Sequence, residues 1–424
     1  MDKIAWVVPS LRSGIGKYTK VVNKCLEQNI DLHIFVAEEG FDIDQLKQFP
    51  LVIYNFGNNK ESLALYLALR KYPGVILLHD QTYHHFFAYY YFEYIKRPDL
   101  YYEALSILYG EDVANYVQRE INSGIMIWDT EACIKYPLRE LLYPHSTGII
   151  VHSKSFLESI LKEYNGVKIY IPFPFEIDNL YSYENIDKRL LNLPNERLIL
   201  FSYGYISENR MIDEVLSLIG EIDKIRQKIF YVVAGHVHDK YLDKINATIV
   251  KYQLTNNVKI CGYISNKELY KYLNIADLCI NLRKYNTEGA SWSVLEQMSY
   301  RKAVLAMDNG FFSELPDDVL IKVKDIRELK EKLLKIVQNP LNLKEIGIKA
   351  QEYVVKNFNP NFFVNEFLKF LENFISQRNQ KKILNKLLKE IIEIIPFMPK
   401  EIENKVLSKL AENFCEVFLE ANKH

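Results

Sequence analysis

The feature that most constrains the fold is a regular alternation of short apolar runs with helical stretches, which occurs twice along the 424-residue chain. The apolar runs of the first series are KIAWVV, DLHIFVA, LVIY, VILLH, GIIVHS and KIYIP. Those of the second are LILFSYG, IFYVVAG, VKICGYI, DLCINL and AVLAM. Strand, helix, strand at this spacing predicts parallel sheets with helices on both faces. The fold class is therefore α/β, with two doubly wound parallel-sheet domains that face a cleft.

Breaks in the alternation divide the chain into segments. Residues 1–172 hold the first series, with an aromatic-rich helical insertion at about 82–144, and residues 198–358 hold the second. Residues 173–197 between them directly follow Pro172, are rich in polar residues and contain two prolines, which is linker composition. We expect one amphipathic helix at 359–376 and a helical tail at 377–424. The amphipathic tail favours packing on the body or in a homodimer, with peripheral contact to a membrane surface as the alternative.

Charge and cysteine content restrict the partners and the compartment. The 53 basic and 54 acidic side chains nearly cancel, which removes the electrostatic attraction typical of nucleic-acid binding. The five cysteines form no CxxC pair and are typical of reduced thiols. The N-terminal run MDKIAWVVPS is short for a signal peptide, and no apolar run approaches the roughly 18 residues of a membrane span. We expect a cytoplasmic protein.

The first candidate site is the segment LRSGIGKYT, where Gly14 and Gly16 follow a strand and open a helix. Bare backbone at such a junction suits a phosphate or a sugar, because helix N–H groups point toward it. A dinucleotide-binding loop is the rival, with Glu38 or Glu39 as its ribose-binding acid, but Thr19 stands in place of the third glycine. A tight turn without any ligand explains the two glycines equally well.

Two further candidates lie in the second series. Arg210 in GYISENR follows a strand, where a guanidinium suits phosphate oxygens, although a surface arginine is the simpler interpretation. The stretch NTEGASWSVLEQMS contains Glu288 and Glu296. Ser293 and Glu296 fit a helix capping box, which gives Glu296 a structural interpretation. Capping does not explain Glu288, which precedes small residues and a helix start whose positive end suits an anion.

Together these motifs resemble a known family. EGASWSVLEQMSYRKAVLA is similar to EGFGLPVLEAMACGKPVVA, the signature of retaining GT-B glycosyltransferases of family 4, also called glycosyltransferase group 1. SGIGKYT, FSYGYISENR, GYISNKELYKYLNIADLCINL and FFSELP are similar to its other motifs, in the same order, over about residues 1–376. The resemblance implies an N-terminal Rossmann-like acceptor-binding domain, a C-terminal Rossmann-like nucleotide-sugar-binding domain, and no cofactor or metal.

The resemblance also implies roles for individual residues. Glu288 would hold the donor sugar, Glu296 the ribose, and the backbone near Tyr263 and Ile264 the base. The implied donor-binding positions are Gly14, Gly16, Arg210, Tyr263, Ile264, Glu288, Gly289, Ala290, Ser291 and Glu296. The implied catalytic positions are His79, Arg210 and Glu288, and the acceptor-side candidates are His79 and Asp80.

The sequence departs from the family pattern at a few positions. Tyr205 stands where the family has a second phosphate-binding arginine, for which Arg283 is a candidate substitute. Ala290 and Ser291 replace the usual Phe and Gly, which changes the wall around the sugar.

The implied reaction is transfer of a hexosyl group, with retention, from a UDP- or GDP-linked sugar to a saccharide or lipid-linked acceptor in bacterial surface-polysaccharide synthesis. The leaving diphosphate would accept the acceptor's proton. Two alternatives are a nucleotide-sugar epimerase of the same fold and a catalytically silent glycan-binding or scaffold subunit.

Other histidines and the aromatic insertion have weaker functional interpretations. His152 and Ser153 match a family strand end but suit a structural role. His236 and His238 have metal-compatible spacing without an evident third ligand. The aromatic residues of the insertion suit sugar stacking, a membrane-bound acceptor or simple packing, of which packing is the commonest use.

Overall fold

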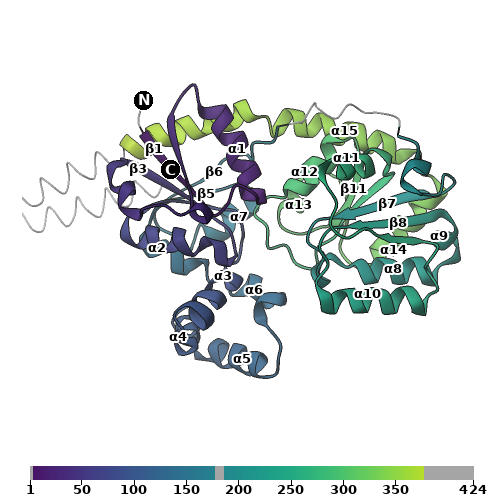
Figure 1. Cartoon of the computed structure of the whole chain (residues 1–424), viewed down its shortest axis with the longest axis horizontal. Coiled ribbons are helices and arrows are strands. Elements are labelled where there is room, and N and C mark those ends of the chain that lie inside the picture. Colours follow the sequence, from purple (N-terminus) through teal and green to yellow (C-terminus); the bar gives the residue numbers. More distant parts are fainter. Residues whose placement is uncertain (1–2, 177–185, 377–424) are drawn as a thin grey trace, which may run out of the picture. The chain divides into compact units, whose positions relative to one another are not determined.

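The computed structural model describes residues 3–176 and 186–376, and two parallel sheets lie within the compact unit Met1–Glu366 (Figure 1). The first sheet has the order β2-β1-β3-β4-β5-β6 and the second the order β12-β11-β10-β7-β8-β9. The strands of the first sheet are β1 (Lys3–Val8), β2 (Asp31–Val36), β3 (Leu51–Phe56), β4 (Gly74–Leu78), β5 (Ser146–Val151) and β6 (Val167–Tyr170). Those of the second are β7 (Leu198–Tyr203), β8 (Ile229–Ala234), β9 (Val258–Ile260), β10 (Leu278–Asn281), β11 (Ala303–Met307) and β12 (Ile321–Val323).

Central strands are buried along their whole length, as the apolar runs predict. All six residues of β3 and all five of β4 are buried, because helices cover both faces of a parallel sheet. In the second sheet, Leu278 of β10 pairs with Ala303 of β11 on one side and with Leu200 of β7 on the other. Continuous apolar strands therefore fix the centre of each sheet.

The strand order reverses once in each sheet, and this determines where a ligand can bind. In the second sheet the chain runs from β7 outward to β9 and then returns to place β10 on the other side of β7. In the first sheet the reversal falls between β1 and β3. Crevices beyond the carboxyl ends of strands at such reversals are the usual ligand sites of open α/β sheets.

Helices occupy both faces of each sheet. In Figure 1, α8 (Ile212–Glu221) and α10 (Asp239–Lys251) lie on one face of the second sheet, and α11 (Asn266–Ile275) and α12 (Trp292–Ser299) lie on the other. The helices that follow strands of the first sheet are α1 (Gly14–Leu26), α2 (Leu63–Lys71) and α7 (Lys154–Ile160). Those of the second half are α8 (Ile212–Glu221), α9 (Asp223–Lys228), α10 (Asp239–Lys251), α11 (Asn266–Ile275), α12 (Trp292–Ser299), α13 (Phe311–Glu314), α14 (Ile326–Gln338) and α15 (Asn342–Asn357). Short 3-10 turns are η1 (Ala37–Glu39), η2 (Ile43–Gln48), η3 (Lys60–Ser62), η5 (Ile127–Asp129), η6 (Arg139–His145), η7 (Lys188–Leu191) and η8 (Glu208–Arg210).

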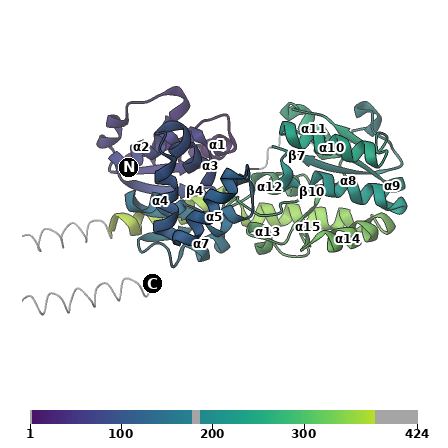
Figure 2. The same cartoon turned by 90° about the horizontal axis from the view of Figure 1, so that it is seen from below.

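The insertion between β4 and β5 is helical, as expected, and its aromatic residues pack together. It contains α3 (His84–Ala88), the π-helical turn η4 (Tyr89–Tyr94), α4 (Pro98–Tyr109), α5 (Glu111–Asn122) and α6 (Ala132–Lys135). Figure 2 shows α4 and α5 side by side. Tyr66 of α2 meets Phe86, Phe87 and Tyr90 edge-on, with ring centroids 5.1 to 5.5 Å apart. Such contacts hold the insertion onto the first sheet.

Residues 360–376 are helical, whereas the expected tail at 377–424 lies outside the described residues, as does part of the expected linker. The four described cysteines are free. Within the described residues, none of the helices combines the length and the apolar character that a bilayer span requires.

Candidate functional site

A pocket of about 680 Å³ lies where loops leave the carboxyl ends of strands of both sheets. The first sheet contributes the segments after β1, β3, β4 and β6, and the second those after β7, β8, β9 and β10. The lining residues used below are Arg12, Gly14, Tyr18, His79, Asp80, Phe173, Tyr203, Gly204, Tyr205, Arg210, Gly235, His236, Tyr263, Ile264, Glu288, Ala290, Trp292, Ser293 and Glu296. The pocket therefore includes both points at which the strand order reverses.

Glycines at the ends of β7 and β8 shape the wall that the second sheet contributes. Gly204 and Gly235 have φ values of +113° and +129°, which L side chains rarely adopt. A Cβ on Gly235 would lie 1.8 Å from the Gly204 carbonyl oxygen. The two strand ends approach so closely only because neither residue has a side chain, and their backbone remains bare toward the pocket.

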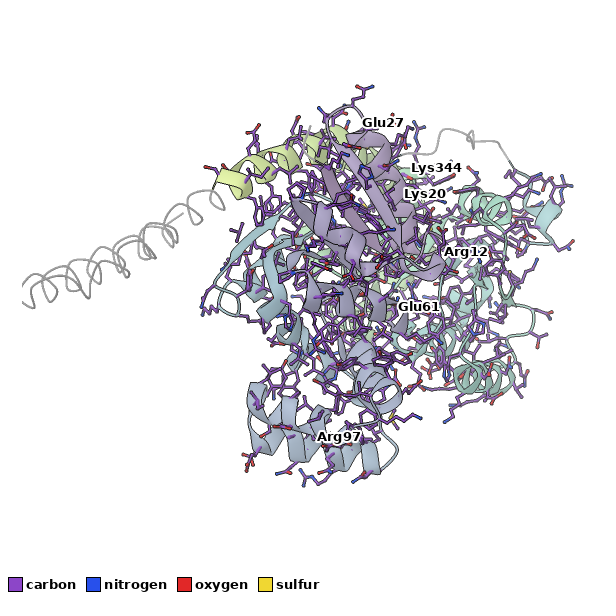
Figure 3. The ribbon with its side chains drawn as sticks, turned by 60° about the vertical axis from the view of Figure 1, so that its left-hand side comes forward. Arg12, Lys20, Glu27, Glu61, Arg97 and Lys344 are labelled. Atoms are coloured by element: carbon purple, nitrogen blue, oxygen red, sulfur yellow. The ribbon has the colours of Figure 1, made fainter. Side chains whose placement is uncertain are left out.

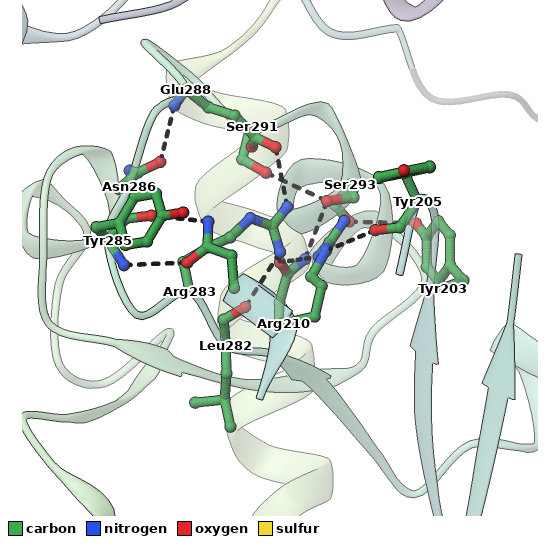
Figure 4. A network of polar contacts seen from close by, with 12 residues as sticks. Tyr203, Tyr205, Arg210, Leu282, Arg283, Tyr285, Asn286, Glu288, Ser291 and Ser293 are labelled. Atoms are coloured by element: carbon green, nitrogen blue, oxygen red, sulfur yellow. Dashed lines mark hydrogen bonds and ion pairs between the residues drawn. The ribbon is translucent and has the colours of Figure 1, made fainter. Parts of the chain in front are cut away.

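The guanidinium groups of Arg210 and Arg283 donate to the same amide oxygen, as the network in Figure 4 shows. Arg210 and Arg283 each place Nη1 3.0 Å from Oδ1 of Asn281, the last residue of β10. The amide nitrogen of Asn281 donates to Ser293 Oγ at 3.0 Å, which fixes the direction of the shared oxygen. Arg210 also donates from Nε to the carbonyl oxygen of Tyr205 at 3.3 Å and lines the pocket. One cation thus faces the pocket and a second lies behind it.

Glu288 is held from below by the second of these cations. Its Oε1 accepts from Arg283 Nη2 at 2.9 Å, and its own N–H donates to Asn286 Oδ1 at 3.0 Å. Arg283 is only 4% exposed and is not among the pocket-lining residues. Arg283 therefore orients Glu288. It does not face the pocket, where it would have to lie to replace the phosphate-binding arginine that the family has at the position of Tyr205.

Glu296 is not part of a capping box, so the structural interpretation drawn from the sequence is wrong. Helix α12 begins at Trp292 with Ser291 as its N-cap residue, and no side chain caps it. Glu296 lies one turn into the helix, 5% exposed, and accepts from the Tyr203 hydroxyl at 2.6 Å and from Trp292 Nε1 at 3.5 Å. These two donors orient a carboxylate that lines the pocket.

Gly289 and Ser291 do not line the pocket, in contrast to their expected position beside the ligand. The Gly289 N–H donates to the carbonyl oxygen of His79 at 2.7 Å, and Gln81 N–H donates to the Thr287 carbonyl at 2.7 Å. These bonds join the loop after β10 to the loop after β4 as an antiparallel bridge between Asp80 and Glu288. Ala290 does face the pocket.

The first sheet presents the start of α1 to the pocket. Gly14 lines it, whereas Gly16 packs below, where a Cβ would lie 2.3 Å from the backbone of Leu11. Arg12 lines the pocket just ahead of α1 and projects outward (Figure 3). Glu38 accepts from the Ser10 hydroxyl and lies 3.7 Å from Arg12 Nη1. Its carboxylate holds the glycine loop and is absent from the lining, which disfavours the dinucleotide interpretation.

His79 and Asp80 follow β4 and line the pocket together. Burial, and secondarily the neighbouring His152, lower the pKa of His79 well below its usual value. Burial raises the pKa of Asp80 to about 7, with a further contribution from the charge of Glu288. The Asn58 N–H donates to Asp80 Oδ2 at 2.8 Å. At neutral pH the pocket thus combines the uncharged imidazole of His79 with the carboxyl group of Asp80, whose pKa is about 7.

Two tyrosine side chains that line the pocket are exposed to solvent. Tyr263 is 86% exposed and Tyr205 56% exposed, although both line the pocket. The Tyr205 and His236 rings have centroids 5.8 Å apart, and Ile264 lies beside Tyr263 in the chain. Exposed rings next to a bare backbone suit a flat ligand group such as a base.

The remaining sequence candidates have other surroundings. His152 is buried between the Tyr18 hydroxyl and the Ile171 carbonyl, and Ser153 caps α7 by accepting from Phe156 N–H, which agrees with structural roles. Within the described residues no group of three or more His, Cys, Asp or Glu side chains is arranged to hold a metal ion. His236 and His238 therefore have no described third ligand.

Sequence reasoning missed Tyr203, Asn281 and Trp292. Tyr203 and Asn281 are the last residues of the apolar runs LILFSY and LCIN. A polar side chain at the carboxyl end of a strand was the sequence signal that could have identified them. Trp292 lies within the motif itself and packs against Phe173 and Phe175, at 5.8 and 5.0 Å between ring centroids.

Comparison with known proteins gives a family match over the second sheet and its helices. Residues 184–353 match the family model Glycosyl transferases group 1. The chain is 24% identical over 237 residues to a poly(ribitol-phosphate) alpha-N-acetylglucosaminyltransferase of Staphylococcus aureus, covering 52% of this chain and 47% of the relative. It is 23% identical over 245 residues to an uncharacterized glycosyltransferase of Methanocaldococcus jannaschii, covering 56% and 61%. The chain thus spans about half the length of the curated relatives it matches.

Solved structures share the architecture over most of the chain. Sucrose-phosphate synthase from Thermosynechococcus elongatus superposes with a TM-score of 0.62 at 14% identity, covering 89% of this chain and 100% of that one. The Anabaena protein HepE, crystallised with UDP and glucose, gives 0.60 at 14% identity, covering 88% and 100%.

Two parallel sheets with a pocket at their strand ends, in the arrangement of these solved structures, define the GT-B fold. The match of residues 184–353 to the model of the group 1 glycosyltransferases confirms the resemblance that the sequence motifs indicate.

Proposed function

We propose that this chain is a retaining, metal-independent glycosyltransferase that uses a nucleotide-diphosphate sugar. The observation that carries the proposal is the convergence of Arg210, Glu288 and Glu296 on one pocket, beyond the ends of β7 and β10. A cation, an oriented carboxylate for sugar hydroxyls and a second carboxylate for ribose hydroxyls are the groups that such a donor requires.

The pocket suggests a place for each part of the donor. The diphosphate would lie between Arg210 and the backbone of Gly14, and the sugar would lie against Glu288 and Ala290. Glu296 would bind the ribose, and the base would lie near Tyr263 and Ile264. Gly289 and Ser291 would support this arrangement from outside the pocket, because the Gly289 N–H is bound to the His79 carbonyl and Ser291 is the N-cap residue of α12.

Leaving-group stabilisation would depend chiefly on Arg210. Preorganised positive charge beside a developing phosphate anion lowers the barrier by several kcal/mol, roughly 3 for a single donor. Arg283, held against Glu288, would act through that carboxylate. The departing diphosphate would accept the acceptor's proton while His79 and Asp80, across the pocket, orient the sugar and the acceptor hydroxyl.

The names of the relatives suggest the substrate class. The Staphylococcus aureus relative is named for an α-linked N-acetylglucosamine and a poly(ribitol-phosphate) acceptor, and HepE was crystallised with UDP and glucose. We therefore propose a UDP-linked hexose as the first donor to test and a cell-surface polymer or its lipid-linked precursor as acceptor.

Thermal denaturation with added nucleotides tests the donor site. UDP, GDP, ADP and their common sugar conjugates would be compared on the wild type and on the Arg210→Ala and Glu296→Ala variants. A ligand that binds only the folded state at 100 times its Kd stabilises it by about 2.7 kcal/mol. We expect one nucleotide to raise Tm, with the increase lost in both variants.

Arg226→Ala is the matched control, because Arg226 is a partly exposed arginine of the same half whose guanidinium donates to the Gln253 carbonyl, away from the pocket lining. It should retain the wild-type nucleotide response. A wild type that responds to none of the nucleotides would contradict the proposal and favour the silent scaffold, an alternative that Tyr205 in the usual arginine position supports. Slow hydrolysis of the bound nucleotide sugar would separate an active enzyme from a protein that only binds.

A further inference from the structure

A buried asparagine lies directly behind the pocket histidine. Asn55, in β3, is 0% exposed. Its Nδ2 donates to the carbonyl oxygen of Val7 at 3.2 Å, and its Oδ1 lies 3.4 Å from Nε2 of His79. Only the nitrogen of an amide donates to a carbonyl oxygen, so the Val7 contact determines which end of Asn55 faces the histidine.

The orientation of Asn55 determines the protonation of the imidazole. An amide oxygen only accepts, so the ring nitrogen beside it must carry a hydrogen. Burial, with His152 nearby, lowers the pKa of His79, so a second proton on the ring is disfavoured. The neutral ring then has its proton on Nε2 and its lone pair on Nδ1.

The other titratable groups that face the His79 ring do not change its protonation state. Tyr18 of α1 and His152 after β5 contact it at centroid distances of 4.9 and 5.9 Å. His152 Nδ1 donates to the Ile171 carbonyl at 2.8 Å, so its Nε2 accepts from the Tyr18 hydroxyl at 3.0 Å. Burial raises the pKa of Tyr18 and lowers that of His152 to about 4.

Neither neighbour therefore supplies a negative charge that would stabilise an imidazolium. The next residue, Asp80, directs Oδ2 to the Asn58 N–H, and the backbone of His79 is fixed by the Gly289 N–H. The ring is thus held from several sides while it lines the pocket.

We propose that Asn55 is a positioning residue that fixes His79 as the neutral tautomer with its proton on Nε2, so that Nδ1 accepts a hydrogen bond from a hydroxyl in the pocket. The identity of that hydroxyl, on the transferred sugar or the acceptor, rests on the proposed function. The tautomer does not. His79 in this state cannot donate a proton to the leaving group, and its contribution is orientation.

Nitrogen NMR of histidine in the full chain tests the tautomer directly. The chain has nine histidines, and the signals absent from a His79→Asn spectrum assign the pair from His79. Between about pH 6 and pH 8, the range in which an ordinary histidine titrates, we expect a protonated, pyrrole-type Nε2 and an unprotonated, pyridine-type Nδ1. The opposite tautomer, or a doubly protonated ring, would overturn the proposal.

Substitutions at position 55 test whether Asn55 is the cause. Asn55→Asp places a carboxylate beside the Nε2 proton and should move the titration of His79 to higher pH. Asn55→Leu removes the acceptor and should yield a mixture of tautomers. An Asn55→Leu spectrum identical to that of the wild type would refute the role of Asn55, and the wild-type spectrum alone remains decisive for the tautomer if neither variant folds.

Activity supplies an independent comparison. Asparagine at position 79 places its amide near the site of Nδ1, whereas glutamine reaches the site of Nε2. We expect His79→Asn to retain at least tenfold more donor hydrolysis or transfer than His79→Gln, and equal losses would contradict the assigned acceptor atom. Because NMR reports the tautomer without any substrate, a failed tautomer prediction is distinguishable from the absence of nucleotide binding.

Discussion

At the scale of single residues, the two glutamates of the pocket differ in the side chains that donate hydrogen bonds to them. Glu288 and Glu296 are both glutamates in one short motif, yet Arg283 holds the first and Tyr203 with Trp292 hold the second. A carboxylate whose oxygens already have protein donors loses less conformational freedom when a ligand hydroxyl binds its remaining lone pairs. Because Glu288 and Glu296 are held by different donors, each carboxylate is oriented for a different ligand hydroxyl.

Removal of the Tyr203 hydroxyl should weaken nucleotide binding. Tyr203→Phe keeps the ring and deletes the 2.6 Å bond to Glu296 Oε2, so the carboxylate would be oriented only by the longer contact from Trp292 Nε1. A hydrogen bond to a charged group contributes about 1.5–3 kcal/mol, and we expect the Kd of the bound nucleotide to rise roughly tenfold, as measured by calorimetry.

Tyr231→Phe provides the comparison for this experiment. Tyr231 is a buried tyrosine of the neighbouring strand β8, and its hydroxyl lies 2.7 Å from Ser202 Oγ, away from the pocket lining. Both variants should lose stability, but only Tyr203→Phe should lose affinity. Equal affinities in the two variants would show that Tyr203 does not orient the ligand-binding carboxylate.

At the scale of elements, the sequence predicts strands better than it predicts the detailed roles of loops. Buried parallel strands have to be apolar on both faces, so runs such as VILLH and LILFSY identify β4 and β7 reliably. A helix start after Glu288 was also expected, and α12 begins at Trp292. The capping-box prediction failed because the Ser293–Glu296 spacing implies a helix start at Ser293, whereas α12 begins at Trp292 with Ser291 as its N-cap residue and without a side-chain cap.

The close approach of β7 and β8 depends on the glycines at their ends. In Gly235→Ala the new Cβ would meet the Gly204 carbonyl oxygen at 1.8 Å, in addition to the strain of a φ of +129°. Backbone strain and overpacking each cost about 1–3 kcal/mol. We expect a loss of about 2–5 kcal/mol in the free energy of unfolding, measured by urea denaturation, together with loss of nucleotide binding.

Gly124→Ala separates strain from collision. Gly124, after α5, has a φ of +85° with open space around the Cβ position, so it should lose only about 1–2 kcal/mol. The same loss at both positions would mean that the strand ends relax around the methyl group and that their contact does not require glycine.

At the scale of the whole molecule, two loops more than 200 residues apart join the sheets. The loop after β4 and the loop after β10 pair through the His79, Gln81, Thr287 and Gly289 backbones, and Gln81 Nε2 donates to the Glu288 carbonyl at 3.1 Å. Glu314 of α13 also accepts from the N–H groups of Lys154 and Ser155 at the start of α7.

The sequence motif indicated that the loop after β10 matters, but not that its glycine contacts the other sheet. Gly289 was expected beside the ligand because small residues let backbone N–H groups approach phosphate. The same property lets its N–H approach the carbonyl oxygen of His79. A one-dimensional pattern cannot distinguish these two uses of glycine, since the partner lies in a distant segment of the chain.

The bridge brings the Asp80 carboxyl toward Glu288, and this should appear in the pH dependence of stability. The folded-state pKa of Asp80, about 7, exceeds the ordinary value of about 3.9. Between these values the folded chain keeps a proton that the unfolded chain has released, so the contribution of Asp80 to stability decreases as pH rises. The decrease is at most about 1.4 kcal/mol per pH unit and ends above about pH 7.

Asp80→Asn removes this titration while its amide oxygen can still accept from the Asn58 N–H. The variant should therefore gain stability relative to the wild type as the pH rises from about 5 to 7 and remain level relative to it above about pH 7.5. Urea unfolding of both proteins at each pH measures this difference, and the histidine titrations common to both cancel.

Asp99→Asn tests whether the effect is specific to Asp80. Asp99, an exposed residue of α4, has a pKa lowered chiefly by its hydrogen bond with Arg97. Its contribution is lost only as the pH falls below this window, so its difference from the wild type should stay constant between about pH 5 and 8. If the Asp80→Asn difference is equally constant, Asp80 is ionised throughout, and the two carboxylates that face each other from opposite sheets carry two full charges.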